Sequence, residues 1–373
     1  MLAGGLAGCT SSTQGASSET TASVGPTIPL TSSSVTGTTA WATLAMGHLD
    51  DPLNTFWQLL KLNGPLWKLA TPPGVASNGG LVTAAAPESV LAAFGPSQDL
   101  QFSPLARTVD QGSTWQAGVL PAGVSLVPDA VIQGANDSLA LLSVAGGKVV
   151  SATTADLSRW TPVTTASSLR RQAGQGACRL QSLTAVTLDA NGSPLVGASC
   201  AHDGHAGLFA QSSGSWVSTG PAIGEGASGP TEVIRLDQTA AGTAALVSAG
   251  SGAAARLYGM WSINGLGPWT VSGGLPLNGA SLRSTGVTAA GGFVVSTRRG
   301  NAPPSASVLD PKGSQWTPLR PLPSGTISVT ANPAGSYDAL VPVDSTLSVY
   351  GLEATGWARL QTLRVDIPFG SSG

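Results

Sequence analysis

The chain has 373 residues, of which 42% are hydrophobic and 10% are charged, and its formal net charge is −2. Low charge with high apolar content excludes a disordered chain and predicts a large core. The longest basic runs are Arg170-Arg171 and Arg298-Arg299, which excludes the basic face that a nucleic-acid partner requires, and no apolar run is long enough for a membrane-spanning helix.

The first residues resemble a lipoprotein export signal. Leu6-Ala7-Gly8-Cys9 is similar to a bacterial lipobox, and this resemblance implies cleavage before Cys9 and a lipid such as palmitate on that residue. No charged residue precedes the motif, so we expect a start codon upstream or a truncated fragment. The alternative to a lipobox is a flexible Gly/Ala-rich end with a chance cysteine. We predict that residues 1–8 are the remnant of a signal peptide. The protein is then extracytoplasmic and contacts the cell membrane only through lipidated Cys9.

The next segment has the composition of a flexible linker. Between residues 10 and 40 nearly all residues are Ser, Thr, Gly, Ala or Val, and Glu19 is the only charged one. Such a segment buries too little apolar surface to fold. We therefore predict a disordered tether over residues 9–40, a folded region over 41–368 and a disordered tail over 369–373.

Polar and aromatic residues gather between Met46 and Gln58, in a chain otherwise poor in them. Asp51-Pro52 predicts a turn between two strands. One hypothesis is a ligand platform, in which an indole stacks on the ligand and polar side chains form hydrogen bonds with it. Its members are His48, Asp50, Asn54 and Trp57. The alternative is a hairpin whose polar groups only satisfy the turn.

Tryptophan recurs at a regular period along the chain. The separations are 48, 45, 56, 53, 47 and 41 residues for Trp67, Trp115, Trp160, Trp216, Trp269, Trp316 and Trp357. Blades of β-propellers have this period, roughly 40–50 residues each. Together with the chain's 49 glycines and 26 prolines, the period predicts an all-β chain of many short strands. We predict a β-propeller of seven four-stranded blades, with six or eight as alternatives.

One period shows the strands of a blade. Apolar runs occur at residues 130–132, 139–144 and 148–153, and Trp160 begins a fourth strand. Gly146-Gly147 predicts a tight hairpin, because both glycines can take positive φ. Four antiparallel strands per period form one blade.

Closure of the ring removes exposed sheet edges. Propellers normally achieve it with one blade built from both ends of the chain. We therefore expect the segment near Trp41 to pair with strands over residues 360–368.

A turn motif lies at residues 108–115, in the order Thr-Val-Asp-Gln-Gly-Ser-Thr-Trp. Asp110 can accept hydrogen bonds from its own turn, Gly112 gives the backbone freedom that the turn requires, and the indole of Trp115 packs between sheets. The motif, which begins at Thr108, resembles the Asp-box (BNR repeat) of sialidase-like propellers. That resemblance implies a structural turn between the third and fourth strands of a blade.

Two cysteines remain once Cys9 is lipidated. Cys178 and Cys200 fall in one repeat, on what we predict to be neighbouring strands, and an exported protein can oxidise them. We predict a disulfide, with two buried thiols as the alternative. Residues 200–205 also contain two histidines and an aspartate, but a closed zinc site needs a fourth ligand, so we predict no metal.

Catalytic motifs are sparse. Sialidases of the fold that the motif resembles use three arginines, a Tyr nucleophile with a Glu partner and an Asp as acid catalyst, and they carry an Arg-Ile-Pro signature. The chain lacks Arg-Ile-Pro, and before the Asp-box-like turn it has one arginine, Arg107. Its three histidines, His48, His202 and His205, do not favour a Ser/His/Asp triad.

The sequence therefore favours a non-catalytic binding or scaffold module, without a cofactor and expected as a monomer. Its expected partner is a protein or glycan at the cell surface, because enzymes need tuned acid or base groups in a cleft. One alternative is a sialidase-like glycoside hydrolase. Another is an assembly factor for a membrane complex, since photosystem-assembly propellers with Asp-boxes are similar.

Overall fold

The structure is a computed structural model in which strands dominate. It describes residues 31–47, 55–72, 81–85, 90–94, 102–121, 128–133, 139–144, 147–153, 155–173, 178–189, 191–201, 204–224, 227 and 229–364. Within these ranges lie one α-helix, α1 (Ala166–Gln172), and one short 3-10 helix, Gly252–Ala254. None of the helices in the described ranges is long and apolar enough to cross a membrane.

The strands follow one another in antiparallel sets of four, which we call blades. The first three blades are β1 (Thr31–Thr36), β2 (Thr39–Gly47), β3 (Thr55–Asn63) and β4 (Leu66–Leu69); β5 (Leu81–Ala85), β6 (Val90–Phe94), β7 (Phe102–Thr108) and β8 (Gln116–Pro121); and β9 (Pro128–Gln133), β10 (Leu139–Val144), β11 (Lys148–Thr153) and β12 (Asp156–Thr165). In the third blade, the strands coincide closely with the apolar runs of the sequence.

The later blades repeat this order. They are β13 (Leu180–Leu188), β14 (Pro194–Cys200), β15 (Gly207–Ser212) and β16 (Ser215–Ser218); β17 (Thr231–Thr239), β18 (Gly242–Ala249), β19 (Arg256–Ser262) and β20 (Thr270–Val271); β22 (Ser281–Val287), β23 (Phe293–Arg298), β24 (Ser305–Leu309) and β25 (Thr317–Pro318); and β26 (Ser328–Ala331), β27 (Tyr337–Val343), β28 (Thr346–Glu353) and β29 (Gly356–Arg364). The short strand β21 (Leu275–Pro276) pairs with β19.

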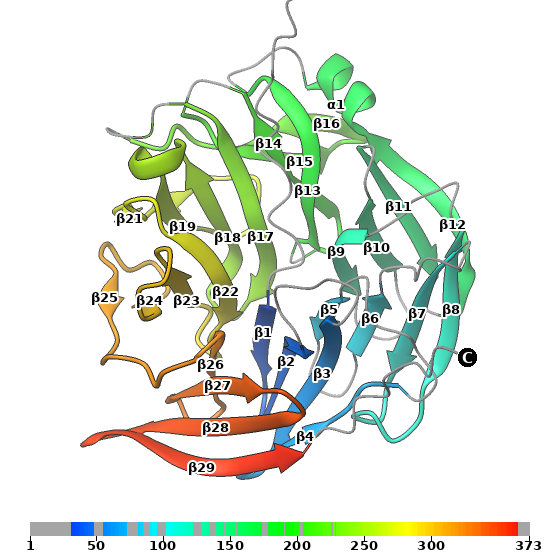
Figure 1. The fold of residues 1–373 in the computed structure, drawn as a ribbon. Helices are drawn as coiled ribbons and strands as arrows, with labels where there is room; N and C mark the ends of the chain where they lie inside the picture. The colour runs from blue at the N-terminus through cyan, green and yellow to red at the C-terminus, as the bar shows by residue number, and fades with distance from the viewer. Residues whose placement is uncertain are drawn as a thin grey trace, which may run out of the picture.

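The periodic tryptophans mark the fourth strand of each blade. Four of them lie within it and three come directly before it: Trp67 in β4, Trp160 in β12, Trp216 in β16 and Trp357 in β29, then Trp115 before β8, Trp269 before β20 and Trp316 before β25. The blades follow one another around a common axis, and the last blade lies beside the first (Figure 1). The all-β prediction and the rotational order of the blades are confirmed, whereas the blade count of seven stays a prediction.

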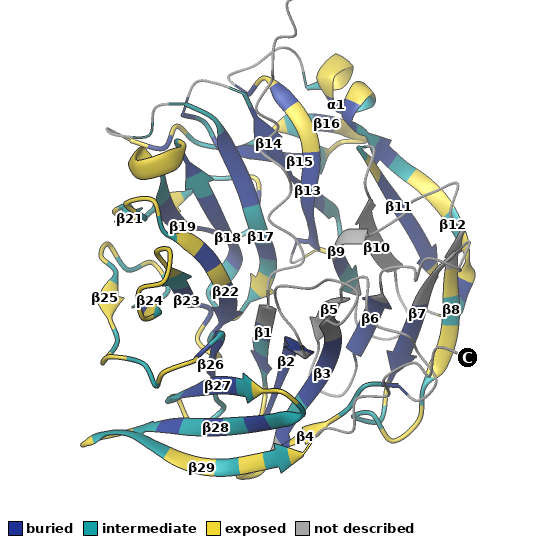
Figure 2. Ribbon diagram, viewed as in Figure 1, coloured by how far each residue is buried: buried dark blue, intermediate teal, exposed yellow. Residues whose placement is uncertain are grey.

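Burial follows the position of a strand within its blade. The second strand β18 is buried along most of its length, whereas the fourth strand β29 is mostly intermediate or exposed. Figure 2 shows the same gradient in other blades. The middle strands lie between two neighbouring blades, so both of their faces lose water. Burial of a large aliphatic side chain contributes about 1.5–3 kcal/mol.

Near the axis, strands of different blades meet directly. The first strand β1 pairs in parallel with β22, with Ser33 opposite Gly286. Arg235 of β17 joins them: its Nη2 donates to Ser34 Oγ at 2.7 Å and its Nη1 to the Thr285 carbonyl at 3.2 Å. Its Nε donates to Asp237 Oδ2 at 2.7 Å. This arginine therefore links three first strands rather than lining an open channel as a free cation.

Two expectations about the ends of the folded region are wrong. Trp41 lies in β2, which pairs with β1 and β3, and β29 pairs with β28, so within the described residues no blade combines strands from the segment near Trp41 and from residues 360–364. The folded region also begins earlier than predicted, because β1 lies inside the segment 9–40 expected to be a tether. Pairing with β22, which is distant in sequence, supplies backbone hydrogen bonds that composition alone could not indicate.

The junction between the first and last blades, which we call the seam, is made by side chains. Gln361 Nε2 donates to the Trp67 carbonyl, and the Trp67 N–H donates to Gln361 Oε1, both at 2.9 Å. Trp67 Nε1 also donates to Asp338 Oδ2 at 2.8 Å. Trp67 and Asp338 are 1% and 2% exposed, so the bond between them is shielded from water. Asn332 provides a second donor to the Asp338 carboxylate, at 3.2 Å.

Candidate functional site

The topology gives the propeller two distinct faces. In an antiparallel blade, the turn between the second and third strands lies on the same side as the connections to the neighbouring blades. We call this side the connection face. The opposite face carries the turns between first and second strands and between third and fourth strands.

The predicted ligand platform is only partly within the described residues. His48, Asp50 and Asn54 lie outside them, between β2 and β3 in the chain. Trp57 is 8% exposed and belongs to a core cluster with Trp41 and residues of the second blade. Its indole therefore contributes to packing between blades, and the ligand platform stays a prediction.

The predicted cysteine pair forms a disulfide. Cys178 and Cys200 are bonded, and both are buried at the connection-face end of β13 and β14. Cys9, the predicted lipidation site, lies outside the described residues, as do His202 and Asp203. The described residues contain no group of three or more His, Cys, Asp or Glu side chains placed to hold a metal ion.

The Asp-box-like residues form a self-contained turn on the opposite face. Asp110 accepts hydrogen bonds from the Thr114 N–H at 2.8 Å and from the Thr114 hydroxyl at 2.6 Å. Thr108 Oγ1 donates to the same carboxylate and accepts from the Gly112 N–H at 2.8 Å. Gly112 has a φ of 87°, and the Trp115 indole lies close to its Cα. These bonds lower the pKa of Asp110 to about 2, the Thr114 hydroxyl being the largest cause.

A second turn of related build escaped the sequence analysis. Ser262, Asn264 and Trp269 have the same spacing as Thr108, Asp110 and Trp115. Asn264 Oδ1 accepts from the Leu266 N–H at 3.0 Å, and this turn also joins the third and fourth strands of its blade. An amide stands at the position of the carboxylate but accepts from the residue two positions on, whereas Asp110 accepts from the residue four positions on.

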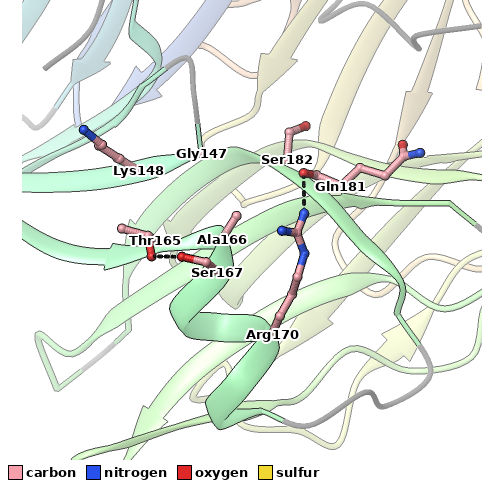
Figure 3. A pocket seen from close by; sticks show the side chains of 8 residues that line it. All are labelled: Gly147, Lys148, Thr165, Ala166, Ser167, Arg170, Gln181 and Ser182. Atoms are coloured by element: carbon pink, nitrogen blue, oxygen red, sulfur yellow. Dashed lines mark hydrogen bonds between the residues drawn. The ribbon is translucent and has the colours of Figure 1, made fainter. Parts of the chain in front are cut away.

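A pocket of about 470 Å³ lies on the connection face between the third and fourth blades. Its lining residues are Gly147, Lys148, Thr165, Ala166, Ser167, Arg170, Gln181 and Ser182. They come from the start of β11, the end of β12, helix α1 and the start of β13. Lys148 and Arg170 stand on opposite sides of the pocket (Figure 3).

Local hydrogen bonds explain how the pocket walls are formed. Thr165 caps α1 by accepting a hydrogen bond from the Ser168 N–H at 3.1 Å, and its hydroxyl is 2.9 Å from the Ser167 hydroxyl. On the opposite wall, the Ser182 hydroxyl is 2.7 Å from that of Ser199. Leu169 lies on the buried side of α1 and packs the helix against the sheet.

The sequence carried one signal for this pocket. The largest tryptophan separation, 56 residues, falls between Trp160 and Trp216. This interval contains α1, so the longer spacing reflects a helical addition between two blades. The arginine pair at residues 170–171 also lies within it.

The chain matches no protein-family model and no curated protein sequence. Among solved structures, it is similar to the GH74 xyloglucanase from Xanthomonas campestris, with 15% identity and a TM-score of 0.55; the match covers 86% of this chain and 51% of that one. This chain thus spans about half the length of the xyloglucanase. It is also similar to a putative 6-phosphogluconolactonase from Bacteroides uniformis, with 12% identity, a TM-score of 0.54 and coverage of 87% and 96%.

A third similar structure is the β-propeller domain of the Trilobed protease from Pyrococcus furiosus, with 6% identity, a TM-score of 0.50 and coverage of 91% and 98%. The chain is a β-propeller. At these identities the likeness shows the fold alone. Because no family model matches, the resemblance to the Asp-box family and the predicted lipoprotein anchor stay predictions.

Proposed function

We propose that this β-propeller is a non-catalytic binding module, exported and anchored by a lipid on Cys9, whose ligand binds at the pocket on the connection face. One observation carries the proposal. The lining side chains provide two cations, three hydroxyls and an amide, but no carboxylate, imidazole or thiol. General acid–base catalysis most often uses His, and also Glu or Asp, and this lining has none of these, whereas its hydroxyl, amide and cationic groups suit binding.

The described carboxylates with shifted pKa values have structural explanations. Asp110 and Asp156 accept hydrogen bonds from their own turns, which lowers the pKa of each. Burial raises the pKa of Asp338, which accepts the Trp67 indole N–H at the seam. A perturbed pKa favours a catalytic role only when structure does not explain it. These three carboxylates therefore give no support to an enzyme.

A glycoside hydrolase remains the second candidate, because the xyloglucanase among the similar structures shares the propeller fold. Such enzymes generally use two carboxylates about 5–10 Å apart. An assembly factor for a membrane complex stays a prediction from the sequence. Binding and turnover must therefore be measured on the same preparation.

The test uses the full chain purified in detergent, incubated with panels of oligosaccharides and peptides. Binding is measured by calorimetry, and hydrolysis by chromatography of the products. We expect saturable binding without products. Ser167→Trp, which fills the pocket, should abolish binding, whereas Ser305→Trp, an exposed position in another blade, should not. Turnover that is lost on changing a carboxylate would establish the hydrolase instead, and binding unaffected by Ser167→Trp would overturn the pocket as the site.

A further inference from the structure

The pocket carries positive charge that its own lining does not neutralise. Lys148 and Arg170 contribute two cations, and no lining residue is acidic. Elsewhere in the described residues, two arginines do have carboxylate partners: Arg235 pairs with Asp237, and Arg159 lies 3.5 Å from Asp156. Uncompensated positive charge around one concave site favours an anionic ligand, because like charges brought together without a counterion repel each other. Arg170 is directed towards other lining residues, whereas the Lys148 side chain extends away from them (Figure 3).

Arg170 is held rigidly in an orientation suited to binding. Its Nε donates to the Leu180 carbonyl at 2.9 Å, and its Nη2 donates to the Gln181 carbonyl at 3.0 Å. These bonds fix the plane of the guanidinium. Its Nη1 has no partner within the described residues, so it can donate to a ligand without a further loss of side-chain freedom. Pre-organisation of this kind lowers the entropic cost of binding.

The disulfide strengthens this arrangement. Cys178 lies two residues before Leu180, whose carbonyl accepts from Arg170. Cys200 follows Ser199, whose hydroxyl contacts Ser182 on the pocket wall. Both groups that hold the β13 side of the pocket are therefore next to the covalent link.

The remaining lining groups favour a sugar over a peptide. The hydroxyls of Thr165, Ser167 and Ser182 both donate and accept hydrogen bonds, as sugar hydroxyls do. Peptides usually bind along a sheet edge or in a groove with apolar anchor pockets. The only apolar side chain in this lining is that of Ala166.

We propose that the pocket binds an acidic sugar unit of a glycan, whose carboxylate or sulfate group contacts Arg170 and whose hydroxyls contact the serine and threonine side chains, while exposed Lys148 adds positive charge nearby. This proposal rests on the binding function proposed above. A pocket of about 470 Å³ is within the range of small-ligand sites. The charged group provides the specificity, and the hydroxyls orient the ring.

The experiment measures binding of the full chain to four probes: an oligogalacturonate, a sulfated heparin oligosaccharide, a neutral xylo-oligosaccharide and a glutamate-rich peptide. We expect one or both acidic glycans to bind, and the better probe distinguishes carboxylate from sulfate. Arg170→Gln should weaken binding roughly tenfold or more, since hydrogen bonds to charged groups are strong, and Lys148→Gln should weaken it less. Binding should also weaken in ~1 M salt.

Arg299→Gln is the matched control, because Arg299 is an exposed member of the other arginine pair and lies in a second-to-third strand turn on the same face. It should leave affinity unchanged. Lys148 is exposed, so its variant tests the charge even where Arg170→Gln unfolds α1, which circular dichroism would show. Equal binding of the neutral glycan, still blocked by Ser167→Trp, would overturn the acidic ligand but keep the binding function. Binding of the peptide alone would overturn the glycan, and indifference of all probes to the pocket variants would overturn both proposals.

Discussion

The two faces of this propeller are built from different kinds of segment. On the opposite face, four successive blades turn from their first to their second strand with one spacing, in which a polar residue precedes a glycine by three positions. The pairs are Asp189 and Gly192, Thr239 and Gly242, Thr288 and Gly291, and Asn332 and Gly335. All four glycines have positive φ, between 80° and 109°.

The polar residue caps each of these turns. Asp189 accepts from the N–H groups of Asn191 and Ser193, both at 2.8 Å. Asn332 accepts in the same way from Ala334 at 3.1 Å and Ser336 at 2.9 Å. The turn is thus specified by its own few residues, and it recurs wherever they recur.

The connection face shows no comparable repeat among the described segments. The connection from β12 to β13 contains a helix, whereas β20 and β22 are joined through the short strand β21. The turns of the opposite face are therefore specified by a repeated local motif. The segments of the connection face vary from blade to blade and can hold a binding site, as loops on a rigid scaffold commonly do.

The largest expected effect on stability comes from removing the Cys178–Cys200 disulfide on the connection face. The double variant Cys178→Ser/Cys200→Ser should lower the free energy of unfolding by about 3 kcal/mol, because the disulfide closes a loop across a separation of 22 residues. Urea denaturation of oxidised wild type and variant measures the difference. An unchanged midpoint would mean that the repeated turns alone determine stability.

The next largest effect on stability is expected at the seam, which lies near the face that carries the repeated turns. Asp338→Ala leaves the Trp67 indole N–H and the Asn332 amide without their shared acceptor, at a cost of about 2 kcal/mol. Denaturant unfolding of Asp338→Ala against wild type gives the value. A loss below ~0.5 kcal/mol would show that water replaces the carboxylate and that the seam is open.

The same carboxylate predicts a pH dependence. Burial raises the pKa of Asp338 above its ordinary value of 3.8, so the folded state holds the proton more tightly than the unfolded chain does. The free energy of unfolding should therefore fall as the pH rises from 3.8 through the raised pKa. Asp338→Asn should remove this slope, which unfolding curves between pH 4 and 8 would reveal.

A single methyl group tests the repeated turn itself. Gly335 has a φ of 81° and no atom within 4 Å of an added Cβ, so Gly335→Ala isolates the backbone cost, about 1 kcal/mol. Gly224 has equally open surroundings without the positive φ, and Gly224→Ala should change stability by less than ~0.5 kcal/mol. Thermal melting of both variants makes the comparison, and equal shifts would contradict the role of the left-handed conformation.

The smallest effect is expected at the Asp-box-like turn. The pKa of Asp110 is lowered to about 2, so its hydrogen bonds stabilise the fold fully above pH 3.8 and lose that contribution as the pH falls towards 2. Asp110→Asn should lower neutral stability modestly and flatten the loss of stability at acid pH, because an amide, like the protonated carboxyl, has only one acceptor oxygen for the two bonds from Thr114. Acid unfolding followed by tryptophan fluorescence tests it. If the variant lost stability just as steeply as the pH fell, other carboxylates would be responsible for that loss.

The sequence alone determined the features that depend on neighbouring residues. The tryptophan period located the fourth strand of each blade, Gly112 and Asp110 identified a turn, and the two cysteines of one repeat indicated their disulfide. Such features follow from steric preference, hydrogen bonding within a few residues and the alternation of apolar strands with turns.

Only the tertiary structure decided how distant segments meet. It placed Trp57 in the core between two blades, paired β1 with β22, and closed the ring through Gln361 and Asp338 instead of a shared blade. It also brought Lys148 and Arg170 to one pocket. These contacts join residues far apart in the chain, and the free energy that selects them is determined by which surfaces the whole ring buries. No local pattern contains that information.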